Sequence, residues 1–337
     1  MNMGIGVGIV GAGNIGRKRA EALSKFRDCR LVAVADANVQ AARYLGGQHG
    51  AAAERDWQRL VLRHDIDIVI VSTINKFLFP VCLAALKNRK HVLCEKPLGR
   101  NSREARLLVA AAGKSGVVLK TGFNHRYHPA VVKAKALSDR GEIGKIHLLR
   151  CRYGHGGRPG YEKEWRASKV LCGGGELLDQ GVHVVDLFRW FAGDFDAVSG
   201  QIATLFWDMK VEDNALAVFK KKGPVLASLQ TSWSQWKNLF SFEIFGDRGY
   251  LVIDGLGGSY GVETLTVGKR KLQGGVPSEK IFRFPGPDIS WEREWKDLVS
   301  AVRRGTKVSG SGWDGYQANK MLEAVYRSAE KRKEIRF

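Results

Sequence analysis

The stretch "GIVGAGNIGRKRAEAL", from Gly8 to Leu23, decides the fold because its glycines have the spacing Gly11-x-Gly13-x-x-Gly16. An apolar, strand-like run precedes these glycines and a helix-like run follows them. Gly11 permits a tight turn, Gly13 lets the backbone approach a pyrophosphate, and Gly16 lets the helix pack closely on the strand. The backbone N–H groups at the helix start then face the phosphates. The stretch therefore predicts a dinucleotide-binding loop.

A carboxylate follows the second strand-like run, because "LVAVAD" ends at Asp36. An acidic residue about 20 residues beyond the glycine loop binds the hydroxyl groups of the adenine ribose. Asp36 would also repel a 2′-phosphate, and its neighbours Ala37 and Asn38 offer no cation to bind one. The sequence therefore predicts NAD rather than NADP as the cofactor.

The first 125 residues alternate between short apolar runs and longer helix-like runs. Such alternation is typical of βαβ units around a parallel sheet that is buried on both faces. We therefore predict an N-terminal Rossmann domain at residues 1–125. Its expected strands are Ile5–Gly11, Leu31–Asp36, Asp67–Thr73, His91–Pro97 and Val117–Phe123, and its expected helices are Asn14–Phe26, Val39–Leu45, Trp57–Leu62, Leu78–Asn88 and Ser102–Ala112.

The pattern changes after Pro129, where apolar and polar residues alternate in runs such as "IHLLRCRY", "NALAVFK" and "YLVIDG". This alternation is typical of antiparallel strands with one exposed face. A helix-like run, Gly181–Phe191, interrupts these strands, and two more, Trp291–Arg303 and Trp313–Lys331, close the chain. The predicted fold class is thus α/β, with a second α/β domain at residues 126–337 that holds a large, mainly antiparallel open sheet.

Length and composition exclude several classes of protein. The 337 residues exceed the usual size of one hydrophobic core, which agrees with two domains. No apolar run reaches the roughly 18 residues that span a bilayer, and the N-terminus lacks the pattern of a signal peptide, so no membrane partner is expected. Five scattered cysteines, without a CxxC pair or a zinc-like histidine spacing, predict reduced thiols in a cytoplasmic protein and no metal site.

The chain is strongly basic, with 54 lysines and arginines, 34 acidic residues and a formal net charge of +20. The basic residues are spread along the chain, without a basic arm or a nucleic-acid motif. No nucleic-acid partner is therefore expected. The charge fits a basic solvated surface or an anionic small molecule, such as a sugar acid or a nucleotide sugar.

The stretch "GGGELLDQGVHVVDLFRW", from Gly173 to Trp190, places ionisable groups in an apolar, helix-like run. Asp179 and His183 are four residues apart, so on one helix they would return to nearly the same face. Oxidation of an alcohol needs a base for the hydroxyl proton, and histidine suits this role because its ordinary pKa lies near neutrality. Asp179 would orient the hydroxyl or tune the imidazole, whereas Asp186 is expected to brace the helix. The alternative is a structural Asp179–His183 pair.

With these motifs the chain resembles the Gfo/Idh/MocA oxidoreductases, which include glucose-fructose oxidoreductase and inositol 2-dehydrogenase. "GIVGAGNIG", "CEKPLGRN" (Cys94–Asn101) and the Gly173–Trp190 stretch follow in the family's order, and "GFNHRYHP" (Gly122–Pro129) is also similar. The resemblance covers nearly the whole chain. It implies a Rossmann domain, an α/β domain whose open sheet is often used for oligomerisation, and a cofactor in a cleft between them. A homodimer or homotetramer is therefore expected.

The resemblance also implies roles for particular residues. Lys96 matches the family lysine that touches substrate beside the nicotinamide, and Asp179 and His183 match its Asp-x-x-x-His pair. These three are the expected catalytic residues, with Lys96 stabilising a developing alkoxide. Ile74 and Leu78 depart from the family's pattern in the loop "VSTINKFLFP". The residues expected to bind the cofactor are Gly11, Gly13, Asn14, Ile15, Gly16, Asp36, Thr73, Asn75, Glu95, Lys96, Asn124, Trp165 and Arg166.

A second group of residues is expected to bind the substrate, with structural alternatives for several members. Asn124 and Arg126 follow a strand end, where open α/β sheets bind ligands, or else they link the domains. Trp233 or Trp236 would stack a sugar, or pack in the sheet. The residues expected to bind the substrate are Lys96, Arg126, Tyr161, Asp179, His183 and Trp233.

The leading hypothesis is an NAD-dependent oxidoreductase that transfers a hydride between nicotinamide and a hydroxyl-bearing carbon of a sugar, cyclic polyol or nucleotide sugar. One alternative is an NAD-dependent glycosidase that oxidises C3 transiently, and another is a non-catalytic NAD- and sugar-binding regulator. Net NADH accumulates with a dehydrogenase and not with a self-recycling glycosidase. The presence of Lys96, Asp179 and His183 argues against the regulator.

Overall fold

The computed structural model describes residues 4–337, which form two compact units. The first unit consists of the chain up to Phe123 together with Val170–Gly173 and Trp291–Asn319. The second consists of Asn124–Lys169, Gly174–Ser290 and Lys320–Phe337. The expected boundary after residue 125 lies close to this division. A continuous domain at 126–337 does not match it, because residues 291–319 pack with the first unit.

Among the described residues, six strands of the first unit form one parallel sheet in the order β3-β2-β1-β4-β5-β6. This order is that of dinucleotide-binding folds, with the topological switch point between β1 and β4. It confirms the predicted Rossmann-like domain. The strands are β1 (Ile5–Val10), β2 (Cys29–Ala35), β3 (Ala52–Glu54), β4 (Ile68–Val71), β5 (His91–Cys94) and β6 (Leu119–Thr121).

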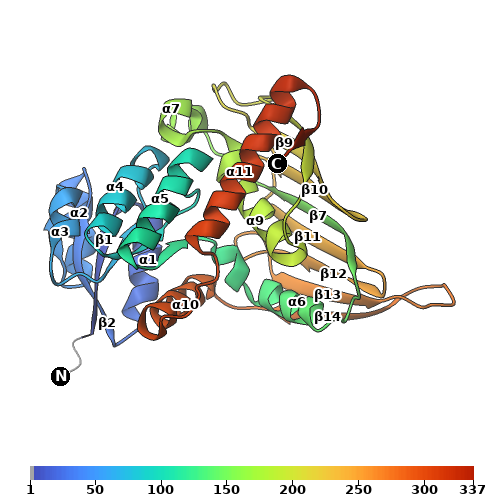
Figure 1. The fold of residues 1–337 in the computed structure, drawn as a ribbon, viewed down its shortest axis with the longest axis horizontal. Helices are drawn as coiled ribbons and strands as arrows, with labels where there is room; N and C mark the ends of the chain where they lie inside the picture. Colours follow the sequence, from blue (N-terminus) through green and yellow to red (C-terminus); the bar gives the residue numbers. More distant parts are fainter. Residues whose placement is uncertain (1–3) are drawn as a thin grey trace. The chain divides into compact units, whose positions relative to one another are not determined.

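Helices cover both faces of this sheet, so its strands are apolar on both sides. One core includes side chains of α1 (Asn14–Ser24), α2 (Val39–Gln48) and α10 (Ser290–Arg304). The other includes side chains of α3 (Trp57–Leu62), α4 (Asn75–Lys87) and α5 (Ser102–Ser115), and Figure 1 shows α4 and α5 side by side. Trp295, Leu298 and Val299 of α10 enter the first core, which explains why this late segment belongs to the first unit.

The second unit holds an open sheet in the order β14-β13-β12-β11-β7-β10-β9-β8-β15. Among these described strands, β7 and β10 run parallel and every other neighbouring pair is antiparallel, as expected. The strands are β7 (Ile146–Gly154), β8 (Ala197–Ala203), β9 (Asn214–Lys221), β10 (Val225–Ser232), β11 (Leu239–Gly246), β12 (Gly249–Asp254), β13 (Glu263–Lys269), β14 (Ser278–Phe284) and β15 (Ile335–Arg336).

Helices pack on one face of this open sheet, namely α6 (Pro129–Asp139), α8 (Glu176–Asp179) and α9 (Gly181–Ala192) (Figure 1). Side chains of β9 alternate between buried and exposed, with Phe219 buried and Leu216 and Val218 exposed. The exposed side chains belong to the opposite face, because successive residues of a strand point to opposite sides. The predicted alternation is therefore confirmed, and an apolar face of the sheet is exposed in this chain.

Two further helices complete the secondary structure. The short α7 (Lys169–Cys172) precedes the glycine run, and α11 (Gly312–Lys331) precedes β15. Within residues 4–337, the structure contains no helix with both the length and the apolar character that crossing a bilayer requires.

Candidate active site

The glycine loop follows β1 and shows a different requirement at each glycine. Gly11 has a φ of +106°, and an added Cβ would lie 2.5 Å from the Ser72 carbonyl oxygen. A Cβ on Gly16 would lie 2.0 Å from the Gly11 carbonyl oxygen, so the fold itself demands both glycines. A Cβ on Gly13 would meet nothing within 4 Å. Bare backbone beside open space at a helix start is the arrangement that a pyrophosphate requires, so the loop fits a dinucleotide.

Asp36, just beyond β2, organises the same loop. Its carboxylate accepts a hydrogen bond of 2.7 Å from the Ala12 N–H and one of 2.8 Å from the Asn38 N–H. The side chain is partly exposed, and a carboxylate has about four lone-pair sites, so it retains acceptor capacity for two ribose hydroxyls. The position agrees with the expected NAD specificity.

We expect Asp36→Ala to lower kcat/KM for NAD more than for NADP, and so to narrow the preference for NAD. The substitution removes the acceptor for the ribose hydroxyls and the negative charge that repels a 2′-phosphate. Asp36→Asn is the matched control, because its amide oxygen can still accept one of the two loop hydrogen bonds. The measurement is kcat/KM with each cofactor at saturating substrate. A wild-type chain that prefers NADP by roughly tenfold or more would contradict the assignment.

The polar side chains of the loop after β4 form hydrogen bonds to backbone carbonyls of the first unit. The Thr73 hydroxyl donates to the Ile74 carbonyl at 2.9 Å. The buried Asn75 amide donates to the Cys172 carbonyl at 2.9 Å, which ties the α7 segment to the start of α4. Leu78, which departs from the family's pattern, is fully buried in the core. The Asn75 side chain therefore has a structural partner, and its expected cofactor contact stays a prediction.

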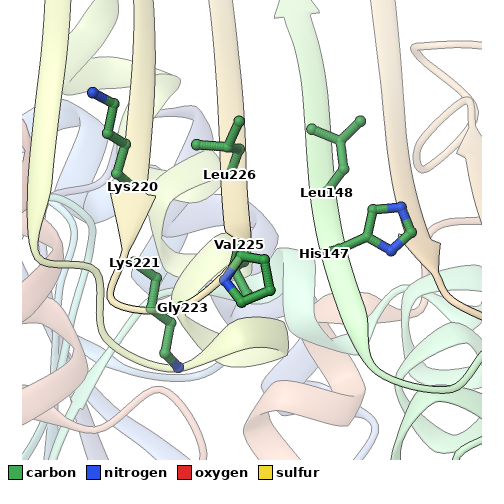
Figure 2. A pocket seen from close by; sticks show the side chains of 8 residues that line it. His147, Leu148, Lys220, Lys221, Gly223, Val225 and Leu226 are labelled. Atoms are coloured by element: carbon green, nitrogen blue, oxygen red, sulfur yellow. The ribbon is translucent and has the colours of Figure 1, made fainter.

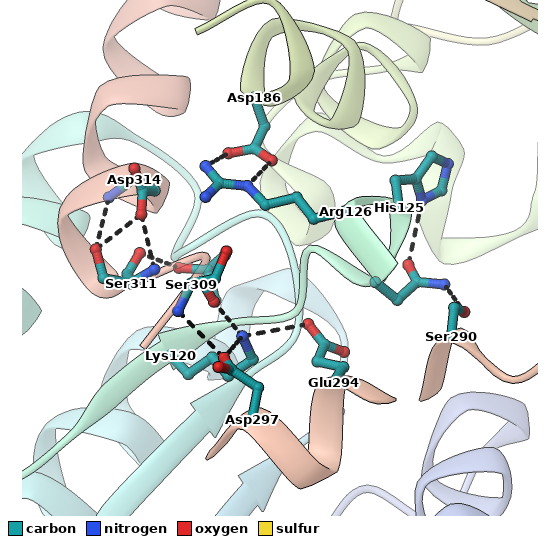
Figure 3. Close-up of polar contacts among 12 residues, drawn as sticks. Lys120, His125, Arg126, Asp186, Ser290, Glu294, Asp297, Ser309, Ser311 and Asp314 are labelled. Atoms are coloured by element: carbon teal, nitrogen blue, oxygen red, sulfur yellow. Dashed lines mark hydrogen bonds and ion pairs between the residues drawn. The ribbon is translucent and has the colours of Figure 1, made fainter. Parts of the chain in front are cut away.

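Glu95, at the end of β5, belongs to a buried ionic cluster in the first unit. Arg19 of α1 donates from Nε to Glu95 at 2.7 Å and from Nη1 to Glu294 of α10 at 2.5 Å. Lys120, also buried, lies 3.9 Å from Glu294 and 3.3 Å from Asp297 (Figure 3). Buried charges persist only when they are paired. Glu95 thus anchors α1 through Arg19, and its expected cofactor contact stays a prediction.

The Gly173–Trp190 stretch differs locally from the expected single helix. It forms α8, ending at Asp179, and α9, beginning at Gly181, with Gln180 between them. At the end of α8 the Gln180 N–H donates to the Glu176 carbonyl, and at the start of α9 the His183 N–H donates to the Gln180 carbonyl. Asp179 and His183 therefore lie on consecutive helices, so the same-face argument from helical spacing does not apply to them.

Glu212, which the sequence reasoning missed, fixes the start of α8. Its carboxylate accepts hydrogen bonds from the N–H groups of Gly175 at 2.9 Å and Leu177 at 3.1 Å, and from the Tyr326 hydroxyl at 2.6 Å. Burial raises the pKa of this carboxyl above its usual value. A Cβ on Gly175 would lie 2.1 Å from the Glu212 carbonyl oxygen, so this glycine is required for the close approach.

His183 and Asp186 of α9 each meet a residue of the 3₁₀ helix η1 (Asn124–Tyr127). The His183 ring stacks on the His125 ring, with centroids 3.7 Å apart and planes at 15°. Arg126 donates from Nε at 2.7 Å and from Nη2 at 2.6 Å to the two carboxylate oxygens of Asp186 (Figure 3). Asp186 braces the helix as expected. Arg126 is buried in this pair, which gives it a structural role within the second unit, and its expected substrate contact stays a prediction.

Asp179 lies beside the Trp165–Arg166 pair. Arg166 Nε is 3.6 Å from Asp179 Oδ2 and Nη1 is 3.5 Å from Glu164 Oε2. The Arg166 guanidinium lies 4.5 Å from the centroid of the Trp165 ring. All three charged groups are partly exposed, so these ion pairs are individually weak. Trp165 and Arg166 thus share a partly exposed surface with the expected catalytic Asp179.

The remaining substrate candidates are buried, except for Trp236. Trp233 is fully buried and packs edge-to-face on Tyr161, with centroids 5.1 Å apart. Burial raises the pKa of the Tyr161 phenol above its usual value. Trp233 has no exposed ring face for a sugar, so the structure selects the packing alternative. Trp236 is exposed and packs edge-to-face on Phe206 at 4.5 Å. Asn124 is buried, and its amide donates to the Ser290 hydroxyl at 3.0 Å.

Comparison with known proteins gives consistent matches along the chain. Myo-inositol 2-dehydrogenase of Thermotoga maritima is 26% identical, covering 98% of this chain and 98% of its own. The oxidoreductase YrbE of Bacillus subtilis is 30% identical, covering 97% of this chain and 95% of its own. A solved structure of levoglucosan dehydrogenase in complex with NADH and L-sorbose matches with a TM-score of 0.91 and 25% identity, covering 99% of each chain.

Two family models match separate parts of the sequence. The model described as "Oxidoreductase family, NAD-binding Rossmann fold" matches residues 5–123, and the model of the GFO/IDH/MocA C-terminal domain matches residues 131–252. The chain belongs to the Gfo/Idh/MocA family. This membership confirms the resemblance read from the motifs, and it makes the chain an NAD-dependent oxidoreductase.

In this Gfo/Idh/MocA member, the most informative residues that were not among the predicted site residues are Arg19, His125 and Glu212. Each is buried, and each holds an element that carries a candidate cofactor-binding or catalytic residue. His125 stands inside "GFNHRYHP", so the motif marked its position without indicating its partner. Arg19 and Glu212 have no local signal, because their partners are distant in the sequence.

Proposed function

We propose that this chain transfers a hydride between NAD and a hydroxyl-bearing carbon of a sugar or cyclic polyol. The observation that carries the proposal is the open space beside the Gly13 backbone, in a glycine loop that fits a dinucleotide. The same chain also has Lys96, Asp179 and His183. The names of the relatives, myo-inositol 2-dehydrogenase and levoglucosan dehydrogenase, support the substrate class. Both names describe oxidation of a ring alcohol.

The proposed division of labour follows the chemistry of each side chain. Bound NAD supplies the hydride acceptor. His183 takes the hydroxyl proton as the carbon–oxygen double bond forms, because an imidazole exchanges protons near neutral pH. Lys96 donates a hydrogen bond to the developing alkoxide and stabilises its charge. Asp179, partly exposed beside Arg166, accepts a hydrogen bond from a substrate hydroxyl and orients the ring.

The experiment is a screen of the wild-type chain with NAD against myo-inositol, levoglucosan, D-glucose, a hexuronic acid and UDP-glucose. We expect a rise in absorbance from NADH with at least one compound. p-Nitrophenyl glucosides in the same screen test the glycosidase, which releases nitrophenol without net NADH. One result would count against the proposed activity: the protein binds NADH in a fluorescence titration but reduces no NAD with any compound of the panel.

We also propose that the exposed face of the open sheet joins copies of this chain into a homodimer or homotetramer. Leu216 and Val218 of β9 and Leu226 of β10 are 57%, 41% and 45% exposed. Next to them, a hollow of about 510 Å³ is lined by the ends of β7, β9 and β10 and by the turn at Gly223 (Figure 2). Exposed apolar side chains on adjacent strands are typical of a face that pairs with another protein surface.

Light scattering on the purified chain is expected to give a small multiple of its 37.3 kDa mass. The double variant Leu216→Glu with Leu226→Glu places charges on the sheet face and should reduce the mass to that of one chain. Leu62→Glu is the matched control, because Leu62 is 59% exposed on α3, in the first unit. A wild-type mass of one chain at micromolar concentration would rule out the assembly.

We propose a reducing, cytoplasmic location for the protein. The five cysteines, all among the described residues, form no disulfide with one another, and Cys82, Cys94, Cys151 and Cys172 are buried. Five cysteines without a disulfide are typical of proteins kept in a reducing compartment.

A further inference from the structure

The contact between His125 and His183 joins two elements that are distant in the sequence. The two side chains are 5% and 4% exposed, and their rings overlap at a centroid distance of 3.7 Å. Flat rings at this separation are in van der Waals contact across their faces. Rotation of either ring would break that contact inside a closely packed core. The orientation of the His183 imidazole is therefore coupled to His125.

A salt bridge beside the stack fixes the two backbones. Arg126 follows His125, and Asp186 lies three residues beyond His183. The guanidinium and the carboxylate form two parallel hydrogen bonds of 2.7 Å and 2.6 Å. Bidentate pairs of this kind are geometrically specific. The Arg126–Asp186 salt bridge thus fixes the position of η1 against α9, and it keeps the two rings stacked in addition to their own contact.

Hydrogen bonds hold both ring nitrogens of His125. Its Nδ1 is 3.2 Å from the Asn124 side-chain oxygen, and its Nε2 is 3.1 Å from the Tyr153 hydroxyl. The Tyr153 ring packs on the Tyr260 ring with centroids 5.2 Å apart, and the Tyr260 hydroxyl accepts from the Gln180 amide N–H at 2.9 Å. An amide oxygen can only accept. His125 therefore carries a proton on Nδ1, where it meets Asn124.

Burial keeps the two tyrosines beside the pair protonated. It raises the pKa of the Tyr153 phenol well above its usual value and that of Tyr260 to about 12, so both hydroxyls hold their protons at neutral pH. The protonated Tyr153 hydroxyl is the partner of His125 Nε2 at 3.1 Å. Several other ionisable groups lie around the two histidines. The His128 ring is 5.7 Å from the His125 ring, and the Arg126–Asp186 ion pair lies beside the stack. Glu176 and Asp179 act electrostatically on the two tyrosines.

We infer that His125 is a positioning residue for His183: its ring, held through both nitrogens, is a flat platform that keeps the His183 imidazole in the orientation in which it takes the substrate proton. The inference rests on the proposed role of His183 as the base. Because Asn124 and Tyr153 hold the two nitrogens of His125, the plane of the platform is fixed.

The first test is independent of activity. The full chain with NADH, labelled with ¹⁵N in histidine, is titrated by NMR, and His125→Phe assigns the His125 signals. We expect His125 Nδ1 to carry a proton, because it faces the Asn124 amide oxygen, which can only accept. Tyr153→Phe removes the partner of Nε2 and should shift the Nε2 signal. A His125 Nδ1 without a proton would overturn the inference.

The second test asks whether His183 needs a flat ring at position 125 or only a side chain that fills the core. His125→Leu removes the platform, whereas His125→Phe restores a flat ring without nitrogens. With the panel compound turned over fastest, we expect the leucine variant to lose roughly 10- to 100-fold in kcat, with KM and NADH affinity nearly unchanged. The phenylalanine variant should recover most of the loss. Rates are normalised to the fraction that binds NADH, which corrects for lost stability.

Two results would overturn the platform: full kcat in His125→Leu, or an equal loss in both variants. Failure of the proposed base is distinguishable from either. A folded His183→Ala chain with full turnover would remove His183 from the mechanism, and with it the positioning role of His125, whereas the NMR signals would still report the tautomer of His125 directly.

Discussion

Replacing His183 by alanine is expected to lower kcat by roughly 10²- to 10⁴-fold while NADH affinity stays nearly constant. The reason is that a general base acts on the substrate proton and contributes little to holding the dinucleotide. The glycine loop and Asp36, which fit the dinucleotide, belong to the first unit of the chain, whereas His183 belongs to the second. The measurements are steady-state kinetics and an NADH fluorescence titration on the same preparation.

Two companion variants make the result for His183 specific. His64→Ala is the control, because His64 is exposed on the first unit and has no role in the proposal. Lys96→Ala should lower kcat and also raise KM, since the lysine contacts the hydroxyl in both ground and transition states. If Asp179 and His183 formed a purely structural pair, His183→Ala would lower the melting temperature and leave turnover of the folded fraction near normal.

Gly13→Val is expected to have the opposite effect, with cofactor binding lost first. An added Cβ at Gly13 meets nothing within 4 Å, and the φ of −71° suits any residue, so the chain should fold normally. The valine methyl groups would occupy the space that the pyrophosphate needs. We expect NADH affinity to fall by more than about 100-fold, which corresponds to about 2.8 kcal/mol.

Variants at two other glycines serve as comparisons for Gly13→Val. Gly47→Val is the matched control, because a Cβ on Gly47 of α2 also meets nothing within 4 Å. Gly16→Ala should lose thermal stability and NADH binding together, since its Cβ would lie 2.0 Å from the Gly11 carbonyl oxygen. Tight NADH binding by Gly13→Val would show that the open space at Gly13 does not receive the cofactor.

Much of the fold was predictable because its signals are local. The glycine spacing, the apolar strands of the first unit and the alternating strands of the second each depend on neighbouring residues, and the structure has all three. Cofactor type and family followed from the same short motifs. The exception among the motif helices is the break at Gln180, where the sequence pattern predicted one helix and the structure has two.

The two architectures, the dinucleotide loop, NAD as the cofactor and the family therefore all follow from local sequence patterns. The partners of the buried polar side chains depend on the fold: Arg19 pairs with Glu95, 76 residues apart; Asn75 with Cys172, 97 apart; and Arg126 with Asp186, 60 apart. A buried polar group must find a partner, and the fold decides which distant segment supplies it. For the same reason, the stack of His125 on His183 has no signature in the spacing of either motif.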